Sequence, residues 1–170
     1  MLEELGVEPG GYLVVTAHRA GNVDDPERLR KLVELLRALP GQVVFPLHPR
    51  TRERLEAAGL TNELGDVKTT APLGYLDFLQ LARHARAVLT DSGGVQKEAY
   101  LLGVPCVTLR DTTEWVETVE AGWNVLADLD RDAAIAALER DPPAERPELY
   151  GGGHAAERVC EVVAAYTQRL

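Results

Sequence analysis

Short runs of β-branched and aliphatic residues alternate along this chain with longer segments of helical period. The predicted strands are Tyr12–Thr16, Val43–Pro46, Val67–Thr70, Ala87–Thr90, Cys106–Leu109 and Asn124–Leu126. The predicted helices are Pro26–Leu39, Arg52–Ala58, Tyr75–His84, Gly94–Leu102, Val116–Ala121, Arg131–Arg140 and Ala155–Gln168. Because strands that alternate with helices pair in parallel through crossovers, this order predicts an α/β fold with a doubly wound, parallel, Rossmann-like sheet. We expect residues 1–170 to form a single domain, with 141–153 as a surface connection.

The predicted helix Pro26–Leu39 has the sequence pattern of an amphipathic helix. Asp24 or Asp25 can cap its start, and Pro26 suits its first turn. Its apolar stripe consists of Leu29, Leu32, Val33 and Leu36. The basic residues Arg28, Arg30, Lys31 and Arg37 are expected on its solvated face.

Charge and hydropathy exclude several classes of function. A formal net charge of -9 argues against a nucleic-acid surface, which needs clustered Lys and Arg. No apolar run approaches the roughly 20 residues that span a bilayer, and residues 1–4 do not resemble a signal peptide, so we expect a cytoplasmic location and no membrane partner. Cys106 and Cys160 lack metal-ligand or redox spacing, so we expect buried reduced thiols and no metal.

A glycine-rich segment follows the central predicted strand and opens a helix. Gly93 and Gly94 let the backbone approach an anion, and the first helical N–H groups are unpaired donors. Ser92 can cap the helix and donate to a phosphate, and Glu98, about one turn on, can accept hydrogen bonds from a ribose diol. The alternative is a tight turn with an ordinary surface glutamate. GxGxxG is absent, so nothing supports dinucleotide binding.

Two further strand ends carry a histidine beside or near an arginine. His18 and Arg19 follow the first strand, and His48 and Arg50 follow the second. The carboxyl ends of parallel strands share one edge, where ligands of doubly wound sheets bind. These polar groups at one sheet edge predict a binding site for a small anionic molecule, in which a histidine can stabilise negative charge or donate a proton.

Two aromatic residues lie in the first turn of the predicted helix Tyr75–His84. Tyr75 or Phe78 can stack on a nucleobase there. Phe78 can equally be a core residue of an amphipathic helix, together with Leu79 and Leu81.

Five ordered motifs together resemble the C-terminal half of the non-hydrolysing UDP-N-acetylglucosamine 2-epimerases. They are Thr-Ala-His-Arg, His-Pro-Arg-Thr, Pro-Leu-Gly-Tyr-Leu-Asp-Phe, Asp-Ser-Gly-Gly-Val-Gln-Lys-Glu-Ala and Leu-Arg-Asp-Thr-Thr-Glu. The resemblance implies one half of a glycosyltransferase-B fold and interconversion of UDP-GlcNAc and UDP-ManNAc. It also implies elimination and re-addition of UDP, no nicotinamide or metal cofactor, and a role in cell-envelope polysaccharide biosynthesis.

The resemblance also assigns roles to single residues. It implies that His18 is catalytic near the diphosphate, and that the remaining substrate-binding residues are Leu73, Phe78, Ser92, Gly93, Gly94 and Glu98. Leu73 and Phe78 would line the uridine pocket, Ser92 and both glycines would hold phosphate, and Glu98 would hold the ribose. Arg19 and His48 resemble positions that bind a second, activating UDP-GlcNAc in bacterial members.

Two residues depart from the common motifs. Gly21 stands where a glutamate is usual, and Trp115 stands where an arginine is frequent, which leaves the particular sugar open. The N-terminal half, which supplies proton-transferring carboxylates in the family, is expected to be missing, so we expect UDP binding without stand-alone activity. Full enzymes of this family are usually dimers. The alternatives are the donor-binding domain of a glycosyltransferase and a stand-alone UDP-sugar binding module.

Overall fold

The computed structural model describes residues 2–167, and it confirms the six-stranded parallel sheet. The strands are β1 (Tyr12–Thr16), β2 (Gln42–Pro46), β3 (Lys68–Thr70), β4 (Ala87–Thr90), β5 (Cys106–Thr108) and β6 (Asn124–Leu126). They are ordered β3-β2-β1-β4-β5-β6, and every neighbouring pair is parallel. The chain order reverses between β1 and β4, which places the ligand crevice of such sheets beside these two strands.

Each predicted helix is present within residues 2–167, although several begin or end at other residues than predicted, and two short helices are additional. The helices are α1 (Leu2–Leu5), α2 (Ala20–Val23), α3 (Pro26–Ala38), α4 (Pro49–Ala57), α5 (Tyr75–Arg83), α6 (Gly93–Leu102), α7 (Val116–Glu120), α8 (Arg131–Leu138) and α9 (Ala155–Thr167). Two 3-10 turns span Thr61–Leu64 and Gly151–Gly153. The short elements α1 and α2 were not predicted, because four residues are too few to show a helical period. Gln168, the predicted end of the last helix, lies outside the described residues.

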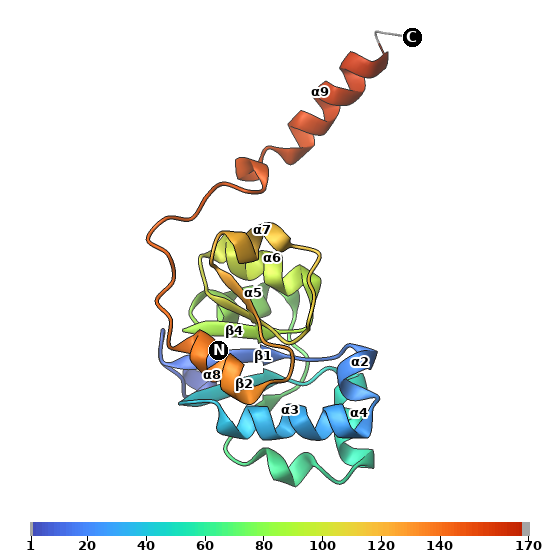
Figure 1. The fold of residues 1–170 in the computed structure, drawn as a ribbon, viewed down its shortest axis with the longest axis vertical. Coiled ribbons are helices and arrows are strands. Elements are labelled where there is room, and N and C mark those ends of the chain that lie inside the picture. Colours follow the sequence, from blue (N-terminus) through green and yellow to red (C-terminus); the bar gives the residue numbers. More distant parts are fainter. Residues whose placement is uncertain (1, 168–170) are drawn as a thin grey trace.

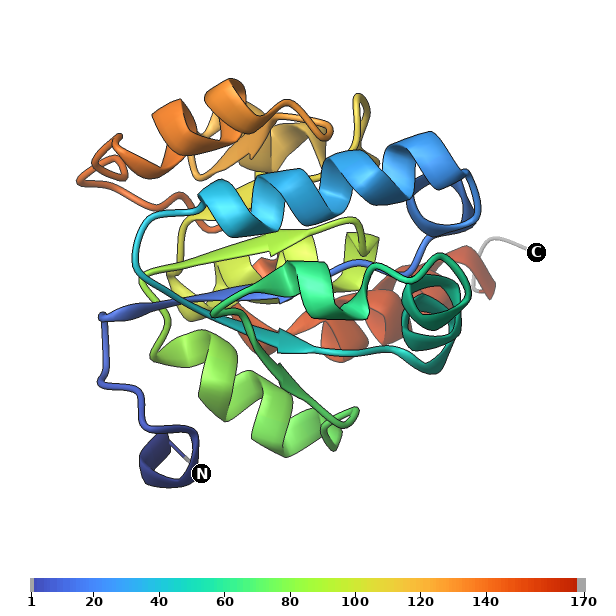
Figure 2. The ribbon, with the colours of Figure 1, turned by 90° about the horizontal axis from the view of Figure 1, so that it is seen from below.

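Helices cover both faces of the sheet, as Figures 1 and 2 show. Leu13 and Val15 of β1 belong to a core shared with the apolar stripe of α3 and with residues of α4 and α8. Tyr12 and Val14 of the same strand point to the other face and join a second core with residues of α5 and α6. Successive strand residues face opposite sides, so two helical layers account for the nearly continuous apolar strands.

The first long helix starts at the predicted cap, but one of its arginines is only partly exposed and is paired. The Asp25 carboxylate accepts a hydrogen bond from the Arg28 backbone N–H. The Arg28 side chain donates to Asp128, at 2.5 and 3.1 Å, and to Asn22 Oδ1 at 2.8 Å. The prediction that Arg28 belongs to the solvated face was therefore wrong, because Asp128 arrives from the loop after β6.

The two cysteines have different surroundings. Cys106 lies in β5 and is buried, and this burial raises the pKa of its thiol to about 12. Cys160 is exposed on α9, so the prediction of a buried thiol was wrong there. The reason is that α9 contributes no buried residue and extends away from the sheet in Figure 1. Residues 141–149 leading toward it are exposed apart from Leu149, as predicted for a surface connection.

Within residues 2–167, no helix combines the length and the apolar character needed to cross a membrane.

The α3 stripe supplies a direct test of the core. Leu32 is fully buried, so we expect Leu32→Ala to lower the free energy of unfolding by about 3 kcal/mol through lost burial and a cavity. Leu76→Ala is the matched control, because Leu76 is 75% exposed and should change stability by under about 0.5 kcal/mol. Urea unfolding followed by circular dichroism measures both. Equal midpoints for the two variants would contradict this core assignment.

Candidate functional site

Polar loops gather at the carboxyl edge of the sheet because the strands are in register. Thr16 pairs with Thr90, and Pro46 pairs with Thr70, so β1 ends level with β4 and β2 ends level with β3. The Thr16 and Thr90 hydroxyls are 2.6 Å apart and tie β1 to β4 at this edge. The predicted convergence of the strand ends is therefore confirmed.

Asp91, the first residue after β4, holds the loop that follows β1. Its side chain is fully buried and accepts hydrogen bonds from the backbone N–H of His18 at 3.0 Å and of Arg19 at 2.9 Å. It also accepts one from Asn22 Nδ2 at 3.2 Å, and Asn22 in turn donates to the Leu109 carbonyl. The sequence analysis did not single out Asp91. Its position in the Asp-Ser-Gly-Gly segment was the available signal, but its donors lie about seventy residues away.

His18 lies between this carboxylate and a second histidine. Its Nδ1 is 3.6 Å from Asp91 Oδ1, and its ring stacks on that of His48 with 5.0 Å between centroids. His48 also caps α4, because its Nδ1 accepts a hydrogen bond from the Arg50 N–H. This accepting nitrogen leaves the His48 Nε2 as its N–H donor. The capping role explains why α4 begins at Pro49 instead of Arg52.

A hollow of about 170 Å³ opens beside these rings. It is lined by Thr16, Ala17, His18, Pro46, His48, Pro72, Leu73, Phe78 and Val95. Phe78 is half-buried and also packs against the core beneath α5, so both interpretations of this residue describe part of its surroundings. The lining is mostly apolar and has imidazoles on one side, which suits a flat heterocycle with polar edges.

The start of α6 presents backbone donors without a side-chain cap. Ser92 occupies the cap position, but its hydroxyl makes no capping hydrogen bond, so that prediction was wrong. Instead the Ser92 N–H donates to the Thr90 hydroxyl at 3.0 Å. The first helical bond runs from the Gln96 N–H to the Ser92 carbonyl, so the N–H groups of Gly93 and Gly94 have no helical acceptor. These donors and the helix dipole favour an anion.

Side chains of the loop after β5 lie close to Gly93. A Cβ atom there would lie 3.3 Å from Glu114 Oε2 and 3.4 Å from Trp115 Nε1. A Cβ at this position would require the Glu114 side chain to shift by a few tenths of an ångström. Gly93 therefore permits a close approach between that loop and α6.

Glu98 lies one turn into α6 and faces Tyr75 at the start of α5. Burial raises the pKa of the Glu98 carboxyl, while a hydrogen bond donated by the Tyr75 hydroxyl acts in the opposite direction. A half-buried carboxylate of this kind can accept hydrogen bonds from a diol. Tyr75 is 62% exposed, and it is thus available to a ligand as well as to Glu98.

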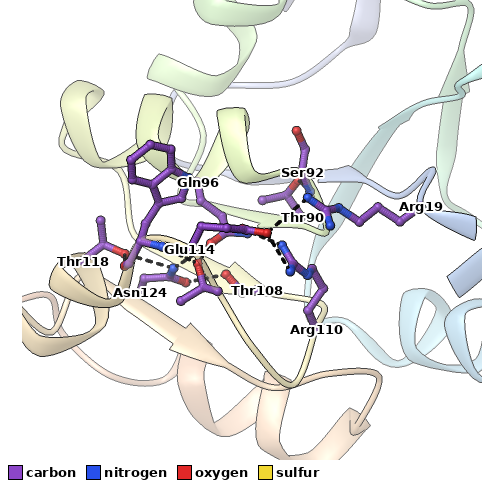
Figure 3. A network of polar contacts seen from close by, with 11 residues as sticks. Arg19, Thr90, Ser92, Gln96, Thr108, Arg110, Glu114, Thr118 and Asn124 are labelled. Carbon is purple, nitrogen blue, oxygen red and sulfur yellow. Dashed lines mark hydrogen bonds and ion pairs between the residues drawn. The ribbon is translucent and has the colours of Figure 1, made fainter. Parts of the chain in front are cut away.

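An arginine pair surrounds Glu114 near the helix start (Figure 3). Arg110 donates two hydrogen bonds to the Glu114 carboxylate, at 2.8 and 2.9 Å, and holds its pKa at about 2. Arg19 approaches the same carboxylate at 3.7 Å and is nearly half exposed. Arg19 and His48, which were predicted to share a second ligand site, thus make different contacts.

Gly21 lies in α2 on the edge of a hollow lined by Arg19, Asn22, Arg28, Arg110, Asp111, Thr112 and Asp128. A Cβ at position 21 would meet no atom within 4 Å, so the structure leaves room for a side chain there. Among residues 2–167, no group of three histidine, cysteine or acidic side chains has a metal-binding arrangement.

Comparison with known proteins places this arrangement in a family. The family model described as UDP-N-acetylglucosamine 2-epimerase matches residues 1–164. A Methanococcus maripaludis protein named UDP-N-acetylglucosamine 2-epimerase homolog is 40% identical over 168 residues, which are 96% of this chain and 47% of that protein. A Pseudomonas aeruginosa protein named UDP-2,3-diacetamido-2,3-dideoxy-D-glucuronate 2-epimerase is 46% identical over 160 residues, which are 91% and 44% of the two chains.

A solved structure agrees with these sequence matches. The Methanocaldococcus jannaschii UDP-GlcNAc 2-epimerase in complex with UDP-GlcNAc and UDP superposes with a TM-score of 0.80 at 40% identity, over 91% of this chain and 45% of that chain. The chain therefore spans about half the length of the relatives it matches. It belongs to the UDP-N-acetylglucosamine 2-epimerase family.

Proposed function

We propose that this chain binds the UDP part of UDP-N-acetylglucosamine as one half of an enzyme that interconverts UDP-GlcNAc and UDP-ManNAc. The observation that carries the proposal is the meeting of the uncapped α6 start, Glu98 and the His18 pocket at one sheet edge. Each part suits one part of UDP: N–H donors for the diphosphate, a carboxylate for the ribose and an apolar hollow for the uracil.

The proposal assigns a part of UDP to each substrate-binding residue that the resemblance predicts. The N–H groups of Gly93 and Gly94 and the Ser92 hydroxyl bind phosphate, and Glu98 binds the ribose. Leu73 and Phe78 line the hollow that takes the uracil. Arg19, beside the helix start, adds a positive charge in reach of the diphosphate, since its contact with Glu114 is loose.

His18 is proposed to act on the departing nucleotide. During elimination the C1–O bond breaks, and its electron pair leaves with the UDP oxygen while C2 loses its proton to a base. His18 can stabilise or protonate that oxygen, and its ring lies 3.6 Å from the Asp91 carboxylate. Re-addition of UDP to the glycal after protonation of C2 from the opposite face completes epimerisation.

The base at C2 is proposed to come from the other half of the enzyme. The relatives are about twice as long as this chain, which supports a second domain across the crevice. We expect the chain alone to bind UDP without epimerising it, because half of a cleft neither positions a base nor excludes water. A cytoplasmic location remains a prediction from the hydropathy pattern, and a homodimer of the full enzyme and a role in cell-envelope polysaccharide biosynthesis remain predictions from the resemblance.

The sugar has a second candidate. The 46% identity to the Pseudomonas aeruginosa protein favours a uronate with two acetamido groups, and its name shares UDP and 2-epimerisation with the first candidate. The UDP part of the proposal is common to both. The second sugar differs from GlcNAc by a carboxylate and a second acetamido group, so the same assay run on each separates them.

The purified chain should bind UDP but convert neither sugar. We expect a calorimetric titration to give one UDP site, and we expect the UDP-GlcNAc to UDP-ManNAc reaction to require an added N-terminal half from a family member. Uridine and inorganic phosphate alone are the comparison ligands, and each should bind more weakly. Absence of UDP binding would refute the proposed site, whereas turnover by the chain alone would refute only the need for a second half.

Replacing Glu98 should weaken nucleotide binding. The ribose hydroxyls would donate hydrogen bonds to the charged Glu98 carboxylate, and losing such bonds costs about 1.5–3 kcal/mol of binding free energy. Glu98→Ala should therefore lower UDP affinity roughly 10- to 100-fold. Glu139→Ala is the control, because Glu139 is exposed at the opposite edge of the sheet beside Arg86. Titration of uridine and 2′-deoxyuridine into both variants measures the ribose contribution. Unchanged UDP affinity in Glu98→Ala would remove the ribose assignment.

Replacing His18 should affect turnover more than binding. In the enzyme completed by an N-terminal half, His18→Ala should reduce kcat about 10²- to 10⁴-fold through loss of proton donation, while UDP affinity changes less. His154→Ala serves as control, since that histidine is 72% exposed next to α9. The steady-state rates of both variants give the comparison. A His18 variant with normal kcat would exclude the catalytic role.

A further inference from the structure

One indole N–H near the start of α6 is buried without an acceptor. Trp115 Nε1 is inaccessible to solvent and makes no hydrogen bond among the described residues. It lies 3.4 Å from the position that a Cβ on Gly93 would occupy. A buried donor usually finds a partner, because leaving it unpaired costs the desolvation of that group. Less than 1 Å² of this nitrogen is accessible, so a ligand atom becomes its partner only when a neighbouring group at this place moves aside.

The indole N–H of the other tryptophan, Trp123, has a hydrogen-bond acceptor. Trp123 Nε1 donates to the Glu145 carbonyl at 3.1 Å. Both indoles pack edge-on against a tyrosine, Trp115 against Tyr150 and Trp123 against Tyr100. The two tryptophans thus form a matched pair that differs in the partner of the N–H group.

The loop that carries Trp115 is fixed from below by buried side chains. Gln96 of α6 is fully buried, and its Oε1 accepts from the Thr113 hydroxyl at 2.5 Å and from Asn124 Nδ2 at 3.3 Å. The Thr113 hydroxyl oxygen accepts from the Trp115 backbone N–H at 3.0 Å. Thr118 donates to the Trp115 carbonyl at 2.7 Å. Figure 3 shows Gln96, Asn124 and Thr118 grouped in this network.

The indole ring is also held from the side. The Lys97 ammonium group lies 4.7 Å from the centroid of the Trp115 ring and 4.4 Å from that of Tyr150. A cation over two aromatic faces stabilises both rings in place. Because its backbone and its ring are both fixed, Trp115 itself loses little further freedom when a ligand uncovers its N–H group and binds it.

We propose that the Trp115 N–H donates a hydrogen bond to an oxygen of the diphosphate that occupies the start of α6. The indole then works beside the N–H groups of Gly93 and Gly94, and Trp115 determines affinity for the diphosphate and not for the nucleoside. Gln96 is a positioning residue, because it acts on the ligand only through the loop. This inference rests on the proposed UDP site.

The test compares Trp115→Phe with Trp123→Phe in the full 170-residue chain. Phenylalanine keeps a ring next to Lys97 and Tyr150 but removes the N–H. Because a hydrogen bond to a charged acceptor is lost, Trp115→Phe should weaken UDP binding about tenfold and leave uridine binding unchanged. Trp123→Phe should change neither affinity. Calorimetric titrations of UDP and uridine into each protein provide the four comparisons with wild type.

A second measurement does not depend on how well Trp115→Phe folds. The chain has two tryptophans, so the Trp123→Phe protein shows a single indole N–H resonance, from Trp115. Saturating UDP should move that proton downfield, as expected for a new hydrogen bond to an anion, and uridine should not. No downfield movement, or an equal loss of UDP and uridine affinity in Trp115→Phe, would overturn the inference. If the wild-type chain binds UDP but neither of these effects is seen, the UDP site is retained and only the role of Trp115 is refuted. If the wild-type chain does not bind UDP, both proposals are refuted.

Discussion

The buried Asp91 carboxylate is the interaction on which the rest of the site depends. It stands at the end of β4, and its acceptors are filled by donors from the loop after β1 and from α2. A buried carboxylate is costly unless its oxygens accept hydrogen bonds, so these donors hold the two strand ends together. His18 and Arg19 therefore project from a loop with a fixed backbone. The catalytic histidine of our proposal is placed by a residue that need not touch substrate.

A second constraint acts on the far side of the α6 start. The loop after β5 approaches closely, so that a Cβ at position 93 would lie 3.3 Å from Glu114, and Glu114, Trp115 and Arg19 all lie around this point. Arg110 pairs with Glu114 and lowers the pKa of that carboxyl to about 2. The contact between Arg19 and Glu114 is longer, at 3.7 Å, so the Arg19 guanidinium can also interact with a ligand. The helix dipole, the uncapped N–H groups, an arginine and an indole N–H then surround the same small volume. Each is modest alone, and in our proposal they act together to hold the diphosphate beside the Glu114 carboxylate, whose charge Arg110 balances.

Periodicity and turn chemistry predicted the elements of this fold because they act over a few residues. The alternation along β1 and the stripe on α3 follow from which side chains must leave water, and six strands were found where the pattern placed them. The short helix α2 and the early start of α4 were missed. The first has too few residues to show a period, and the second depends on His48, a cap that sequence reasoning had assigned to ligand binding.

By itself, the sequence determined the sheet, the edge at which the site forms and the glycines that open α6, since each follows from local propensity and strand direction. Only the tertiary structure decided that Ser92 leaves the helix uncapped, that Arg28 is paired with Asp128 and that Cys160 is exposed. It also decided that Asp91 reaches the β1 loop and that the Trp115 indole faces Gly93 without an acceptor. The physical reason is distance along the chain. These partners are separated by about 20 to 100 residues, and a side chain's hydrogen bonds are fixed by whichever group the folded sheet brings within about 3 Å.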